Sequence, residues 1–165
     1  MLDPEGILVA GGPGNQSRPR VAFDGRNFVV VWEDMRNGKS YEVYAARVSP
    51  EGKVLDAGGV PLPAVKGPPP FDRQMPAVAS FGDGRSLVLW CGSLWTGPPG
   101  GLAIFSDGKF EDKGTVTMTG GDSGYTKGFG AKGRWSHTPV NLSAGKDCYL
   151  VTWRNHRVVG RGGDG

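Results

Sequence analysis

The stretch Pro19-Arg-Val-Ala-Phe-Asp-Gly25, followed by Asn27-Phe-Val-Val-Val-Trp32, decides the fold. A short apolar run, a glycine-bearing turn and a second apolar run are typical of a β-hairpin. The same pattern returns at 76–90 and at 139–153, and each copy ends in a tryptophan. The three tryptophans stand 58 and 63 residues apart. Self-similarity of this kind predicts a repeat architecture.

Each unit continues beyond its tryptophan. A third apolar strand with its turn is expected at 42–52, 102–108 and 157–165, and each of these segments ends at a Glu-Gly or Asp-Gly turn. A fourth strand is expected at 54–62 and 110–118. We therefore expect one all-β domain over 1–165, with four-stranded units at about 19–63, 76–118 and 139–165.

The third unit lacks a fourth strand, and the N-terminal segment is a candidate for it. Residues 1–10 match 54–63 closely. Pairing 1–10 with the last unit would cover an exposed strand edge, as in β-propellers, where radial repetition leaves only short protected edges. We predict three propeller blades, with the N-terminal strand completing the last.

Three blades are fewer than the roughly four to eight that propellers usually contain. Three arrangements would resolve this: two chains that pair into a six-bladed ring, a chain that is part of a longer propeller, or an unusually small closed ring. We expect the homodimer, because the chain ends fall where complementary strands would meet.

The string from Val21 to Gly38, with Tyr41 to Asp56 after it, resembles the tandem repeats of large secreted bacterial β-propeller proteins. The resemblance is close over 19–63 and looser over 76–118 and 139–165. It implies the propeller fold and an exported protein, although 1–15 show no signal peptide because they are glycine-rich and lack an apolar core. Such folds carry lectins, hydrolases and scaffolds alike, so the fold does not fix the function.

Composition excludes several classes of protein. The 29 glycines and 13 prolines lie between short apolar runs, which indicates many turns between strands. The net charge of +3 is spread along the chain, so we expect no nucleic-acid partner. No apolar run reaches the roughly 18 residues of a membrane helix. Cys91 and Cys148 belong toward opposite faces of the aligned blades, whereas a disulfide needs Cα atoms within about 7 Å, so we expect two free thiols. They have no further ligands nearby in sequence, so we expect no metal or cofactor.

The lengths of the connections indicate which face carries function. The turns between the first and second strands and between the third and fourth strands of each unit are short. The loops between the second and third strands, and the links between blades, are long. These long connections, at 34–41, 66–75, 91–101 and 119–138, belong on one face of the predicted blades. Long connections in a compact domain are common sites of function.

Residues outside the repeat pattern collect in and around these connections. The candidate binding residues are Trp95, Trp135, Tyr125, Arg36, Asp34, His137 and His156. Aromatic rings stack on the C–H face of a sugar while polar side chains bind its hydroxyls, so we expect a non-catalytic carbohydrate-binding module. Two plainer interpretations remain. In the first, Trp95 and Trp135 plug the central hole of the ring or pack under their own loops. In the second, Asp34 and Arg36 form a local salt bridge that fixes the loop. The repeated Trp32, Trp90 and Trp153 are expected in the blade core.

A hydrolase with a site on the same face is the second interpretation, although no catalytic residue can be assigned. The acidic candidates Glu33, Asp34, Asp72 and Asp122 show no pairing motif. Ser123 with His137 or His156 is a further combination, but the Gly-x-Ser-x-Gly motif is absent. The third interpretation is a structural or interaction scaffold without activity.

Overall fold

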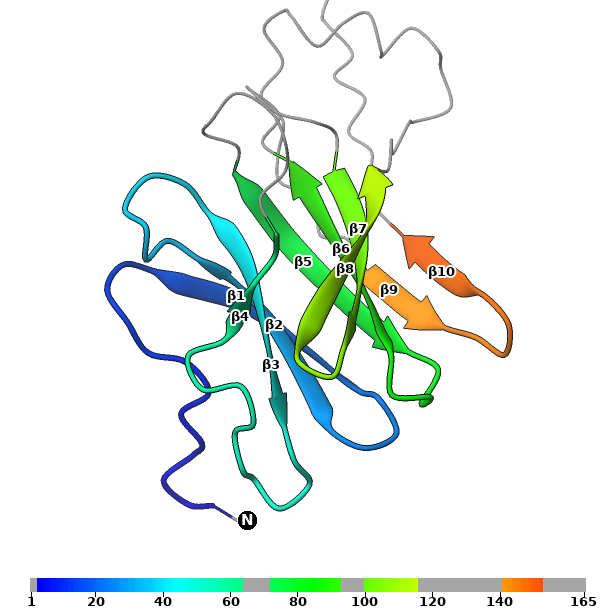
Figure 1. Cartoon of the computed structure of the whole chain (residues 1–165), viewed down its shortest axis with the longest axis horizontal. Coiled ribbons are helices and arrows are strands. Elements are labelled where there is room, and N and C mark those ends of the chain that lie inside the picture. Colours follow the sequence, from blue (N-terminus) through cyan, green and yellow to red (C-terminus); the bar gives the residue numbers. More distant parts are fainter. Residues whose placement is uncertain (1–2, 64–71, 93–99, 116–140, 153–165) are drawn as a thin grey trace, which may run out of the picture.

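The computed structural model describes residues 3–63, 72–92, 100–115 and 141–152, and within them the chain is all-β with no helix (Figure 1). The first antiparallel sheet holds β1 (Gln16–Phe23), β2 (Phe28–Asp34), β3 (Glu42–Val48) and β4 (Val60–Pro61). The second holds β5 (Arg73–Ser80), β6 (Ser86–Gly92), β7 (Gly100–Ser106) and β8 (Lys109–Thr115). A third, two-stranded sheet holds β9 (Asn141–Ala144) and β10 (Tyr149–Thr152). The predicted repeat of antiparallel strands is thus present.

The fourth strand of the first unit is shorter than the expected 54–62. Only Val60–Pro61 pairs with β3, together with one isolated bridge between Val48 and Val54. Between them the chain turns, and the N–H of Gly59 donates to the carbonyl of Asp56 at 2.9 Å. The turn makes room for a ring, since a Cβ atom at Gly59 would lie 2.3 Å from Cη2 of Trp32.

Period-2 alternation gives each sheet two distinct faces. We call the face that carries the unit's tryptophan the Trp face and the opposite one the rear face. In the first sheet, Val29 and Val31 lie on the rear face, and they are fully buried against the second sheet. The second sheet contributes its Trp face to this contact. The core between the two sheets contains Val29, Val31, Val43, Ala45, Leu62, Val78, Val88, Trp90, Ala103 and Phe105.

The next contact along the chain repeats this order. Leu89 and Ala77, on the rear face of the second sheet, are buried in a cluster that includes Leu142 and Val151 of the third unit. The second unit therefore places its Trp face on the rear face of the first, and the third unit places the equivalent face, with Leu142 and Val151, on the rear face of the second. The described residues form an open stack of sheets rather than a closed ring or barrel.

The tryptophan prediction is confirmed where the structure describes it. Trp32 and Trp90 are 4% and 5% exposed, and Trp153 lies outside the described residues. Both cysteines are free thiols, Cys91 half-buried and Cys148 exposed. In the described part of the chain, no helix is long and apolar enough to cross a membrane.

A proline-linked bulge opens the first strand of the two larger units, which the sequence did not predict. Arg18 and Met75 each precede a proline and adopt positive φ angles of 52° and 53°. The register shifts at the same two places, between Ser17 and Arg20 and between Gln74 and Ala77. A non-glycine residue rarely adopts this conformation, and proline disfavours the helical region for the residue before it.

The predicted N-terminal strand is not formed. Residues 3–14 contain no strand, and Ile7 lies against Gly52 in the β3–β4 connection. Further along, the N–H of Met35 donates to the carbonyl of Asn15 at 2.9 Å. The segment therefore runs beside the first unit. A strand needs a partner edge, and the third strand expected for the last unit, at 157–165, lies outside the described residues.

Candidate binding end and its ion-pair frame

The long connections leave the sheets from one end, as the topology of the predicted blades requires. In an antiparallel meander, the end of β2 and the starts of β3 and β5 lie on the same side, and so do the end of β6, the start of β7 and the end of β8 (Figure 1). We call this side the loop end and the opposite side the turn end. The described strand ends that flank 64–71, 93–99 and 116–140 all belong to the loop end.

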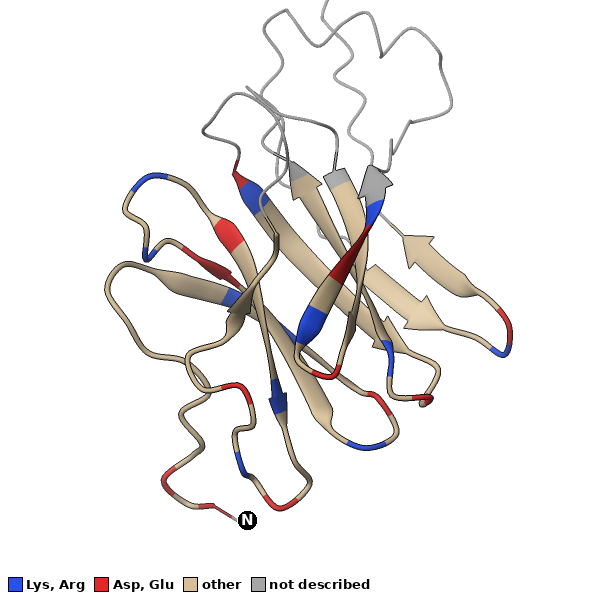
Figure 2. Ribbon diagram, viewed as in Figure 1, with Lys and Arg blue, Asp and Glu red and all other residues tan. Residues whose placement is uncertain are grey.

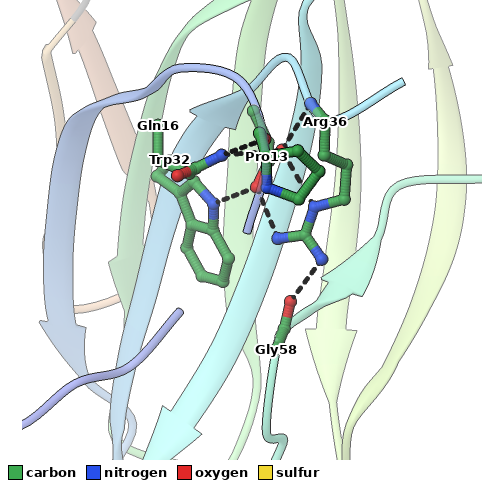
Figure 3. Close-up of polar contacts among 6 residues, drawn as sticks. Pro13, Gln16, Trp32, Arg36 and Gly58 are labelled. Atoms are coloured by element: carbon green, nitrogen blue, oxygen red, sulfur yellow. Dashed lines mark hydrogen bonds and ion pairs between the residues drawn. The ribbon is translucent and has the colours of Figure 1, made fainter. Parts of the chain in front are cut away.

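Asp34 and Arg36 form a tight local ion pair at the loop end. Arg36 donates from Nε to Oδ1 of Asp34 at 2.9 Å and from Nη2 to Oδ2 at 2.5 Å (Figure 3). The backbone N–H of Arg36 and the indole N–H of Trp32 add bonds of 2.9 Å each. The amide of Gln16 donates to the Pro13 carbonyl at 3.0 Å and reaches Oδ1 of Asp34 at 3.5 Å. The structure therefore has the local salt bridge of the plainer interpretation.

This pair also fixes the neighbouring turn. Nη1 of Arg36 donates to the carbonyl of Gly58 at 2.9 Å, and its guanidinium carbon lies 4.2 Å from the ring centroid of Tyr44. The side chain of Asp34 is fully buried, whereas that of Arg36 is 25% exposed. Burial alone would raise the pKa of Asp34, but the bonds from Arg36 and Trp32 outweigh it and lower that pKa. Contact between the exposed edge of Arg36 and a ligand stays a prediction.

Glu33 is fully buried and connects the first two sheets. Its carboxylate accepts bonds of 2.8 and 3.0 Å from Nη1 of Arg18 and one of 3.1 Å from the hydroxyl of Ser17. It also accepts a bond of 2.6 Å from the backbone N–H of Met75, in the bulge of β5. Arg18, in the bulge of β1, thus supplies the cation, and Met75, in the bulge of β5, supplies the amide.

A third ion pair joins Glu42 at the start of β3 to Arg73 at the start of β5. Nη2 of Arg73 lies 2.9 Å from Oε2 of Glu42, although no hydrogen bond of good geometry reaches that oxygen. Nη1 of Arg73 donates to the carbonyls of Leu62 and Pro63 at 3.2 and 2.7 Å. Burial raises the pKa of Glu42, and the charge of Arg73 partly offsets this. Burial likewise lowers the pKa of Arg73.

Asp72 stands next to this pair and is held by the backbone. Its Oδ1 accepts a bond of 2.9 Å from the N–H of Tyr41, while the N–H of Arg73 donates to the Tyr41 carbonyl at 2.8 Å. The loop between β2 and β3 is thus tied to the start of β5. The acidic side chains Glu33, Asp34, Glu42 and Asp72 each have a partner, and the described residues contain no cluster of potential metal ligands.

Charges of both signs are interspersed along the strand ends and turns (Figure 2). At the turn end, Arg47 binds Asp56 through Nε and Nη2 at 2.9 and 3.0 Å, and its Nη1 lies 3.8 Å from Asp107 of the β7–β8 turn. In the described part of the chain, ion pairs therefore tie the first sheet to the second at both ends.

The structure brings together two of the candidate binding residues, Asp34 and Arg36. The other five, Trp95, Trp135, Tyr125, His137 and His156, lie outside the described residues. The bridging roles of Glu33 and Arg73 were missed. For Glu33 a signal was present, because period 2 puts it on the same face as Val29 and Val31. A carboxylate that continues a buried apolar face requires a cation.

No protein-family model, curated protein or solved structure matches this chain. The function must therefore be inferred from the residues at the loop end.

Proposed function

We propose that the chain is a non-catalytic binding module built from propeller-type blades, with carbohydrate held at the loop end. Support for the blades comes from the two complete four-stranded meanders and from their order of stacking. The second sheet places its Trp face on the rear face of the first, and the third unit repeats this contact on the second sheet. Propellers are built by radial repetition of such four-stranded sheets.

The partners of the acidic side chains favour binding over catalysis. General acid–base chemistry needs a carboxyl group or histidine within reach of the substrate, and a glycosidase needs two carboxylates that face each other. The carboxylates of Glu33 and Asp34 are fully buried in ion pairs. Asp72 is held by the Tyr41 amide. Three of the four acidic hydrolase candidates are therefore engaged in contacts that hold the structure together.

The polar contacts at the loop end also favour a preorganised site. Arg73 holds the carbonyls of Leu62 and Pro63, where a long connection begins, and its own backbone starts β5, where that connection ends. Fixing both ends of a loop lowers the entropy that binding must remove. Trp95 belongs to the connection between β6 and β7, and Trp135 to that between β8 and β9. Their rings would supply the stacking surfaces.

A glycan array tests this proposal. We expect the wild-type protein to be retained on at least one class of glycan, and Trp95→Ala or Trp135→Ala to abolish retention. Phe81→Leu is the matched control, because Phe81 is an aromatic residue 41% exposed in a turn-end connection. Retention that survives both tryptophan substitutions, or turnover of the bound glycan, would overturn the proposal.

A further inference from the structure

The Trp face of the first sheet is exposed along β1 and at the start of β2, whereas Val78 and Ser86 at equivalent positions of the second sheet are buried. Elsewhere on this face of the first sheet, Trp32, Ala46 and Val48 are buried within the chain. Val21, Phe23 and Phe28 lie on this face and are 62%, 48% and 42% exposed. Phe23 pairs with Phe28 across β1 and β2, and their ring centroids are 5.2 Å apart. These side chains form an apolar strip, which we call the front strip.

Alignment of the tryptophans identifies the equivalents of the front strip in the second sheet. Phe28 stands four residues before Trp32, as Ser86 does before Trp90. Ser80 pairs with Ser86 as Phe23 pairs with Phe28. Ser86 is 0% exposed, and its neighbours Val88 and Trp90 on the same face pack against the rear face of the first sheet. In the second sheet, this part of the Trp face is thus covered by the rear face of another unit.

The last unit exposes a rear face. Leu150 stands three residues before Trp153, the position that Val29 holds before Trp32. Val29 is fully buried at the contact between the first two sheets, whereas Leu150 is 63% exposed. The two ends of the stack therefore expose the two halves of one interface.

We infer that a second copy of this chain covers the front strip, with the rear face of its β9–β10 unit lying on β1 and β2. The contact continues the interface that already joins the units within the chain. Two such head-to-tail contacts, related by a twofold axis, close a ring of six units, which is within the usual size of propellers. The inference rests on the proposed blades and is independent of the proposed ligand.

Light scattering of the full chain tests the inference. The wild type is expected at twice the chain mass of 17.4 kDa. Phe23→Ser with Phe28→Ser is expected at the single-chain mass with unchanged circular dichroism, because the second sheet folds with serine at both positions. Leu55→Ser is the control, since Leu55 is 40% exposed outside the front strip, and it should stay dimeric.

A mixing experiment tests the head-to-tail arrangement. Phe28→Asp and Leu150→Asp chains should each be monomeric, because each places a charge in both contacts of the ring. An equimolar mixture should recover dimer, since one of its two contacts is then free of substitutions. A monomeric wild type, a dimer that neither substitution weakens, a mixture that stays monomeric or an open-ended polymer would each overturn the inference. Glycan retention is scored separately, so either proposal can fail alone.

Discussion

The carboxylate of Glu33, in β2 of the first sheet, accepts a hydrogen bond of 2.6 Å from the backbone N–H of Met75, in β5 of the second. Met75 reaches this carboxylate because it adopts a left-handed conformation in a bulge. A buried charge is stable only when it is paired, and here Arg18 supplies the opposite charge. The contact joins the first two sheets at the loop end.

Loss of this carboxylate should destabilise the stack. Glu33→Ala leaves the Met75 amide without its acceptor and Arg18 without its ion pair. Because Arg18 is 44% exposed, solvent would take over part of its role, so we expect a loss of about 2 kcal/mol in the free energy of unfolding. Urea titration measures this. Glu111→Ala is the control, since the pair of Glu111 with Lys113 lies at the surface and should contribute under about 0.5 kcal/mol. Equal losses from both substitutions would contradict the bridging role.

A methyl group at Gly59 should lower the free energy of unfolding, because a tryptophan ring lies beside it. The added Cβ atom would lie 2.3 Å from Cη2 of Trp32 and would force the ring to move. Gly58→Ala is a matched control, since Gly58 has a similar positive φ of 77° and open space around it. We expect Gly59→Ala to lower the unfolding free energy by about 2 kcal/mol more than Gly58→Ala. Indistinguishable midpoints would show that the backbone conformation, and not the ring, requires Gly59.

The ion pair of Asp34 should give the protein sensitivity to acid. The folded-state pKa of Asp34 is lowered from 3.8, so the folded chain resists protonation there more than the unfolded chain does. The stabilisation is present above pH 3.8 and is lost as the pH falls through the lower folded-state value. Arg36→Gln removes the main cause of the shift, so the fall in stability in this range should be shallower than in the wild type. Urea midpoints between pH 2 and 6 measure it, and parallel curves would count against the assignment.

The two thiols should react at different rates. Burial raises the pKa of Cys91 to about 11, so little thiolate forms there at neutral pH. Cys148 is exposed. We expect rapid alkylation of one thiol in the native protein and of both in urea without reductant, measured as intact mass. A mass that stays unmodified in urea would indicate a disulfide.

Repetition made the strands predictable from the sequence. The apolar run that ends at Trp32 recurs before Trp90, and both became central strands with buried rings. The shortened fourth strand was not predictable, because the turn that shortens it depends on the distant Trp32 ring. Residues 1–10 were predicted as a strand from their match to 54–63, but of 54–63 only Val60–Pro61 forms a strand, and 3–14 contain none.

At the candidate site, the sequence was sufficient for contacts over short separations. Asp34 and Arg36 are two residues apart, so their ion pair was a natural alternative. The bond from Met75 to Glu33 spans 42 residues and depends on a bulge before a proline. No local pattern reports such a contact, because the angle between two packed sheets determines it.

The most direct test of carbohydrate binding at the loop end is ligand-observed saturation-transfer NMR on a glycan retained by the array. The proposal predicts transfer from the wild type to ring C–H protons of the sugar, its loss in Trp95→Ala and Trp135→Ala, and an unchanged glycan spectrum over days. Transfer that persists in both variants, or the appearance of cleaved product, would contradict it.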